Sequence, residues 1–101
     1  MSGVLGLVGL GLKGGNVAVG VDAVRKELQS NRLGCVVVAA DASPRVLEKV
    51  VRLAEARRVP LVRGPSADEI GARLGRPPVM AVGVRDRGLA QGVLRAASTE
   101  E

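Results

Sequence analysis

The chain has 101 residues, 47% of them hydrophobic and 25% charged, which is the size and balance of one globular domain with a single core. It contains no Phe, Tyr, Trp or His, which excludes base stacking on aromatic rings and removes the commonest general base and metal ligand. A net charge of +5 favours a polyanionic partner such as nucleic acid.

The N-terminal third of the chain predicts helix, strand and helix in succession. Apolar residues over 4–12 predict a helix that Ser2 caps and that ends at the glycines 14–15. The β-branched segment 17–19 predicts a short strand. Apolar residues at helical spacing, with charged residues between them, then predict a second helix over 21–30.

The middle of the chain predicts a buried strand followed by a helix. The unbroken apolar run 35–40 is typical of a strand covered on both faces, so we expect it at the centre of the sheet. Cys35, the single cysteine, begins this run and is expected to be a buried, inert thiol. The Ser-Pro pair at 43–44 marks a helix start, and Glu48 lies four residues before Arg52, the spacing of a surface ion pair.

The C-terminal part repeats the alternation of strand and helix. Residues 60–63 predict a short strand, and Ser66 with Glu69 has the spacing of a capping box that opens a fourth helix ending near Gly75. Residues 79–84 predict another apolar strand, and Asp86 is placed to cap a last helix.

These elements predict an α/β fold of one domain. Helices alternating with short apolar strands indicate a three-layer α/β/α sandwich with a mixed four-stranded sheet. We expect the domain to cover 1–97 and a frayed tail to cover 98–101. The apolar segment 3–12 has no charged leader and is too short to span a membrane, so we interpret it as structure rather than signal. We expect a cytoplasmic protein, and we also expect it to be a monomer.

Two motifs suggest catalysis or nucleotide binding, and both have simpler explanations. Gly9, Gly11 and Gly14 have the spacing of a dinucleotide-binding loop, but that loop needs a strand running into a helix, the reverse of the order expected here. Asp41 ends a buried strand where enzymes often keep a carboxylate, but Asp-Ala-Ser-Pro is also an ordinary turn in which Asp41 and Ser43 bind local backbone amides. We therefore expect no enzymatic activity, no cofactor and no metal.

The start of the second helix is a candidate phosphate site. It follows the flexible Gly20, so it presents open amides, and Arg25 and Lys26 lie one turn further on. A solvated helical face is the simpler interpretation of these residues taken alone.

Several motifs, in this order and at these gaps, resemble the kink-turn RNA-binding ribosomal protein family and, within it, the small bacterial YlxQ branch. The motifs that carry the likeness are Gly14-Gly15-Asn16, Gly20, Lys26, Val36 to Ser43, Val59-Pro60, Ser66 to Gly71, Gly75 and Asp86 to Ala90. The resemblance extends over residues 3–94 and implies the same three-layer fold.

The resemblance also implies binding of a sharply bent RNA duplex at the start of the second helix. The family motif there is Gly-x-Asn-Glu-x-x-Lys, which matches Gly20 and Lys26, whereas Asp22 replaces the Asn and Ala23 replaces the Glu. Asn16 stands where relatives often have Lys. A second family contact, an apolar loop that covers flipped-out bases, corresponds to residues 75–79. The residues expected to contact RNA are Gly15, Asn16, Gly20, Val21, Asp22, Ala23, Arg25, Lys26, Asp41, Arg76, Pro77, Pro78 and Val79.

We therefore expect a non-catalytic protein that recognises kink-turn or similarly bent RNA in association with the ribosome or translation. Because Ala23 cannot hydrogen-bond a guanine edge and Asp22 is negative, affinity for standard kink-turns is expected to be reduced. The alternative is a protein-interaction adaptor that has kept the fold and lost RNA specificity.

Overall fold

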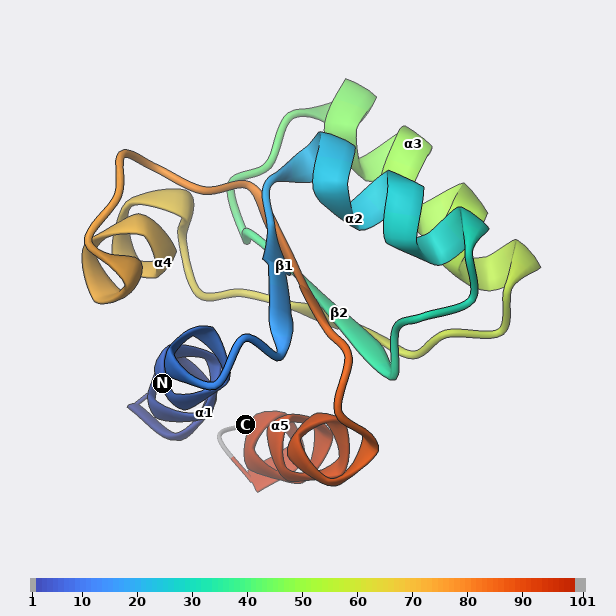
Figure 1. Cartoon of the computed structure of the whole chain (residues 1–101). Helices are drawn as coiled ribbons and strands as arrows, with labels where there is room; N and C mark the ends of the chain where they lie inside the picture. Colours follow the sequence, from blue (N-terminus) through green and yellow to red (C-terminus); the bar gives the residue numbers. More distant parts are fainter. Residues whose placement is uncertain (1, 100–101) are drawn as a thin grey trace.

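A computed structural model describes residues 2–99, which form five helices and four strands (Figure 1). The helices are α1 (Ser2–Lys13), α2 (Val21–Gln29), α3 (Pro44–Ala56), α4 (Ala67–Leu74) and α5 (Arg87–Thr99). The strands are β1 (Val17–Val19), β2 (Cys35–Val38), β3 (Leu61–Arg63) and β4 (Ala81–Val84). The predicted alternation of helices and strands is confirmed.

The four strands form one mixed sheet in the order β1-β4-β2-β3. β4 pairs antiparallel with both β1 and β2, whereas β2 and β3 are parallel. The long apolar run is therefore an inner strand, as predicted. Because β2 and β4 run in opposite directions, the end of β1 and the start of β4 lie at the same end of the sheet as the end of β2.

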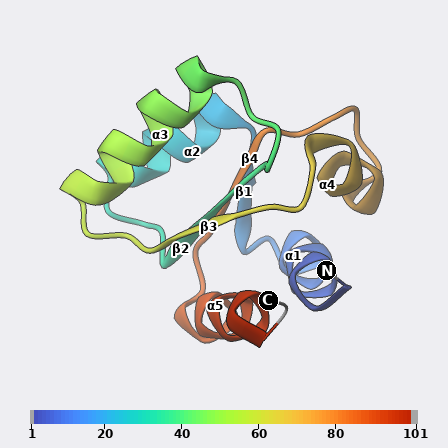
Figure 2. The same cartoon turned by 180° about the vertical axis from the view of Figure 1, so that it is seen from behind.

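Helices cover both faces of the sheet, which confirms the expected fold class. In Figure 1, α2 and α3 lie together above the sheet, while α1 and α5 lie below it with α4 at one side. Figure 2 shows the same separation from behind, with the ends of the chain close together on the lower layer. None of the helices within residues 2–99 is long and apolar enough to cross a bilayer.

Aliphatic side chains and the Cys35 thiol build the core. Every residue of β2 and β4 is buried, as the run of apolar residues requires of strands packed on both faces. Cys35 is fully buried, and this burial raises the pKa of its thiol to about 12. The expected inert thiol is therefore present in the core.

Local capping signals position the helices as expected. The Ser43 hydroxyl accepts a hydrogen bond from the Val46 amide at 3.3 Å, and Ser66 with Glu69 forms the complete capping box. The Asp86 carboxylate accepts from the Leu89 amide at 2.8 Å. Glu48 and Arg52 form the expected surface pair at 3.8 Å.

Several boundaries differ from the expected ones. β2 and β4 are shorter than the predicted apolar runs. At the end of the first run the Ala40 amide donates to the Pro65 carbonyl, and at the start of the second the Val79 amide donates to the Ala67 carbonyl, so neither amide pairs with a neighbouring strand. Helix α1 already includes Ser2, the residue that we expected to precede it as a cap. Helix α5 continues to Thr99, two residues into the expected tail, and 100–101 lie outside the described residues.

Candidate nucleic-acid interface

The turn between β1 and α2 presents the open start of a helix. Gly20 precedes α2 with φ 100° and ψ 155°, a conformation that is essentially restricted to glycine. Its amide donates a 2.9 Å hydrogen bond to the Ala81 carbonyl, which fixes the turn against the start of β4. No side chain among the described residues caps α2, so its first amides can bind an external acceptor.

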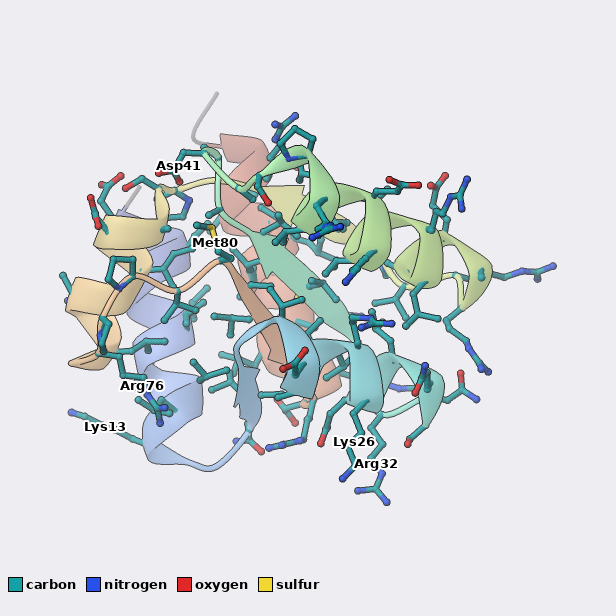
Figure 3. The ribbon with its side chains drawn as sticks, turned by 90° about the horizontal axis from the view of Figure 1, so that it is seen from above. Lys13, Lys26, Arg32, Asp41, Arg76 and Met80 are labelled. Carbon is teal, nitrogen blue, oxygen red and sulfur yellow. The ribbon has the colours of Figure 1, made fainter. Side chains whose placement is uncertain are left out.

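Helix α2 divides its residues between the core and the solvent. Val24 and Leu28 are buried, and Val21 and Ala23 are half-buried, whereas Lys26 is exposed. Figure 3 shows the Lys26 side chain projecting away from the sheet beside that of Arg32, which follows the end of α2. The ammonium group of Lys26 is therefore accessible to a ligand.

Asp22 lies in the exposed first turn of α2. A carboxylate there stabilises the helix, because its charge opposes the partial positive charge of the free amides. The same carboxylate repels an anionic ligand that approaches those amides. The expected reduction in RNA affinity by Asp22 stays a prediction.

Arg25 points away from the Lys26 side of the helix, toward α3. Its neighbours across the groove between α2 and α3 include Arg45 and Lys49. The Arg25 Nε atom is buried without a hydrogen-bond partner. Consecutive helical residues lie about 100° apart around the axis, so Arg25 and Lys26 do not form a single pair of phosphate contacts.

The loop between α4 and β4 is held in place at both of its ends. Gly75 closes α4 in the left-handed conformation with φ 69°, and a Cβ atom at Gly71 would overlap the Pro77 carbonyl. Arg76, Pro77 and Pro78 are exposed on this loop. Val79, which was also expected to contact RNA, is buried at 7% exposure, so the exposed apolar surface of this loop is provided by the two prolines.

Gly15 and Asn16 lie at the other end of β1, where Arg85 holds their turn. The guanidinium of Arg85 donates to the Gly15 carbonyl at 2.8 Å and to Val17 at 3.3 Å, while the Arg85 amide donates to the Asn16 carbonyl at 2.8 Å. Both Gly15 and Asn16 are exposed. They are thus separated from Gly20 by the length of a strand.

Arg85 also binds Glu27 of α2 through two hydrogen bonds, from Nε at 2.7 Å and from the terminal nitrogen at 3.2 Å. This hydrogen bonding holds the pKa of the Glu27 carboxyl below its ordinary value and raises that of Arg85. The pair neutralises Glu27, which adjoins Lys26, and attaches α2 to the turn before β1. Nothing in the local sequence indicated this contact.

Asp41 follows the end of β2, which is the end of the sheet where Gly20 and the loop before β4 lie. Its carboxylate accepts a 2.8 Å hydrogen bond from the Ala67 amide at the start of α4, so it binds a distant helix and not the local turn that we expected. The expected local role falls to Ser43 alone. Figure 3 places Asp41 on the side of the molecule opposite Lys26.

Four exposed cationic side chains are labelled in Figure 3. In this view Lys26 and Arg32 lie together, and Lys13 of α1 and Arg76 of the loop before β4 lie apart from them at lower left. Lys13 and Arg32 were not among the expected contacts. Within residues 2–99 no cluster of three or more metal-binding side chains accompanies them.

Comparison with known proteins identifies the family. Residues 4–93 match the model of the ribosomal protein L7Ae/L30e/S12e/Gadd45 family. The chain belongs to this family. A search of curated protein sequences gives no match.

Solved structures share the family fold at low sequence identity. A Bacillus halodurans protein of unknown function superposes with a TM-score of 0.91 at 19% identity, covering 97% of this chain and 99% of its own. A Giardia lamblia 15.5kD RNA binding protein gives a TM-score of 0.80 at 21% identity, covering 94% of this chain and 82% of its own. At these identities the likeness establishes the fold.

Proposed function

We propose that this L7Ae/L30e-family protein binds a bent, kink-turn-like RNA without catalysing a reaction, in association with the ribosome or translation. The observation that carries the proposal is the accessible Lys26 ammonium group, one turn beyond the uncapped start of α2. Family membership and the fold of the Giardia RNA-binding protein agree with this function. So does the resemblance to the YlxQ branch.

Charge supports contact with a phosphate backbone rather than with bases alone. Lys13, Arg32 and Arg76 are exposed like Lys26 and come from other elements (Figure 3), so further cations are available to an RNA that extends beyond α2. For each phosphate that a cation neutralises, the slope of log affinity against log salt concentration becomes steeper by about one. The loop 75–80 is held in place, so its exposed prolines can contact RNA at little cost in conformational entropy.

The decisive experiment compares one kink-turn RNA with an unbent duplex of the same composition at physiological salt. We expect tighter binding of the kink-turn, and we expect Lys26→Ala to weaken that binding at least about tenfold, the effect of losing a charged contact. Arg76→Ala should weaken it less. Arg95→Ala, an exposed cation of α5, is the matched control and should leave binding unchanged.

A gain-of-function variant tests the same site from the opposite direction. Asp22→Asn combined with Ala23→Glu restores the family motif at the start of α2, and a bidentate base contact contributes about 1–3 kcal/mol of discrimination. Preference for the kink-turn should therefore rise several-fold or more. Unchanged preference in this variant, with wild-type binding in Lys26→Ala, would remove α2 from any RNA interface.

The adaptor alternative predicts a different pattern. An adaptor that has lost RNA would bind neither RNA, and its partners would be retained in a pull-down after ribonuclease treatment. The exposed carboxylate of Asp22 is the feature that favours this alternative. Equal binding of both RNAs that disappears at high salt would instead reduce the function to nonspecific electrostatics.

A further inference from the structure

A second basic surface lies at the opposite end of the sheet from the α2 start. A pocket of about 460 Å³ opens where α2 and α3 end and where α5 begins. The apolar part of its lining, called the floor below, is formed by the buried Leu33 and Ala90, the half-buried Val59 and Leu94, and the exposed Pro60. Because β4 runs antiparallel to β2, this end of the sheet is a strand length away from Gly20 and the loop before β4.

The rim of this pocket is cationic. Arg57, Arg58 and Arg87 line it, and no Asp or Glu does. Within residues 2–99 the carboxylates of Glu48 and Glu27 pair with Arg52 and Arg85, and none of the three rim arginines forms an ion pair with a carboxylate. All three are exposed.

Two of these arginines occupy positions that their local structure disfavours. Arg58 follows α3 in the left-handed conformation, with φ 58°, where glycine is the preferred residue. Arg87 is the first residue of α5, where the partial positive charge of the helix start repels a cation. Departures from local preference of this kind are typical of functional sites.

We propose that this pocket binds an acidic peptide segment of a partner protein, with an apolar side chain on the floor and carboxylates paired to the rim arginines. The apolar floor favours a peptide over a phosphate backbone, which needs no such floor. The absence of aromatic residues disfavours stacked bases. Arginine suits this role because its guanidinium pairs with carboxylates through two hydrogen bonds.

The test uses the full chain labelled with ¹⁵N and a synthetic peptide in which Asp-Glu pairs alternate with Leu. Binding should shift the amide signals of Gly34, Val59 and Ala90, which line or adjoin the pocket, and leave that of Gly20 unchanged. One control peptide carries Asn and Gln in place of the acids. The other carries Ser in place of Leu, and both should bind at least tenfold more weakly.

Variants locate the binding site. Arg58→Gly removes a rim charge while relieving the left-handed backbone, so weaker binding by this variant cannot be attributed to unfolding. Arg58→Gly and Arg87→Gln should each weaken peptide binding at least about fivefold, whereas Arg95→Gln, on the same helix as Arg87 but outside the pocket, should not.

The result is separable from the proposed RNA function, because Arg58→Gly should bind kink-turn RNA as the wild type does. Equal binding of the acidic and the neutral peptide would overturn the proposal, as would absence of shifts at the pocket. Loss of RNA affinity in Arg58→Gly, with no peptide binding, would assign the pocket to a nucleic acid and would also overturn it.

Discussion

The contact between Arg85 and Glu27 offers a sharp test of what holds α2 in position. Arg85→Met keeps the aliphatic part of the side chain but removes two hydrogen bonds to the Glu27 carboxylate and two to the carbonyls of Gly15 and Val17. It also leaves Glu27, whose side chain is only 16% exposed, without its hydrogen-bonded ion-pair partner.

The expected loss of stability follows from these contacts. Hydrogen bonds to charged groups contribute about 1.5–3 kcal/mol when fully buried. The Arg85 side chain is 37% exposed, so solvent screens part of this. We expect Arg85→Met to lower the free energy of unfolding by about 3 kcal/mol and Glu27→Gln to lower it by about 1 kcal/mol.

The assay is urea unfolding followed by circular dichroism, because the chain has no aromatic residue for intrinsic fluorescence. The double variant should show a coupling energy of about 1 kcal/mol or more. Arg52→Met is the control, since it breaks a 3.8 Å pair whose side chains are 80% and 65% exposed and should cost less than about 0.5 kcal/mol. An equally small decrease in the free energy of unfolding in Arg85→Met and Arg52→Met would refute the reasoning.

Acid provides an independent measurement on the same pair. The hydrogen bonds from Arg85 lower the folded-state pKa of Glu27 below its ordinary value of 4.5, so the unfolded chain binds the proton more readily. The stability that this contributes is complete above pH 4.5 and is lost as the pH falls through the folded-state pKa of Glu27. Arg85→Met should lack this component, so its stability should decline less steeply between neutral and acid pH.

Three further predictions concern the backbone and the core. Arg58→Gly should stabilise the protein by about 1 kcal/mol in the same assay, because glycine adopts the left-handed conformation without the strain of a side chain. Gly71→Ala should destabilise it by about 2 kcal/mol or more, since the added methyl overlaps the Pro77 carbonyl, and this is checked by its urea midpoint. The Cys35 thiol, with its pKa raised to about 12, should not react with a disulfide reagent at pH 8 until urea unfolds the chain.

The sequence by itself determined the elements and many of their ends, because those signals act within a few residues. Ser43 caps α3, and Ser66 with Glu69 opens α4, through hydrogen bonds that span three residues. The position of β2 inside the sheet was also predicted from neighbouring residues, because a strand that is covered on both faces has apolar residues at every position. The start of α2 at Gly20 was also predicted from the sequence.

Only the tertiary structure decided which side chains meet. Arg85 reaches Glu27 across 58 positions of the chain, and Asp41 reaches Ala67 across 26. Helical periodicity does give the direction of a side chain around its own axis, but not which element faces it, because that depends on strand order and helix packing. For this reason the sequence predicted neither the contact of Asp41 with the start of α4 nor the position of Arg25 beside α3.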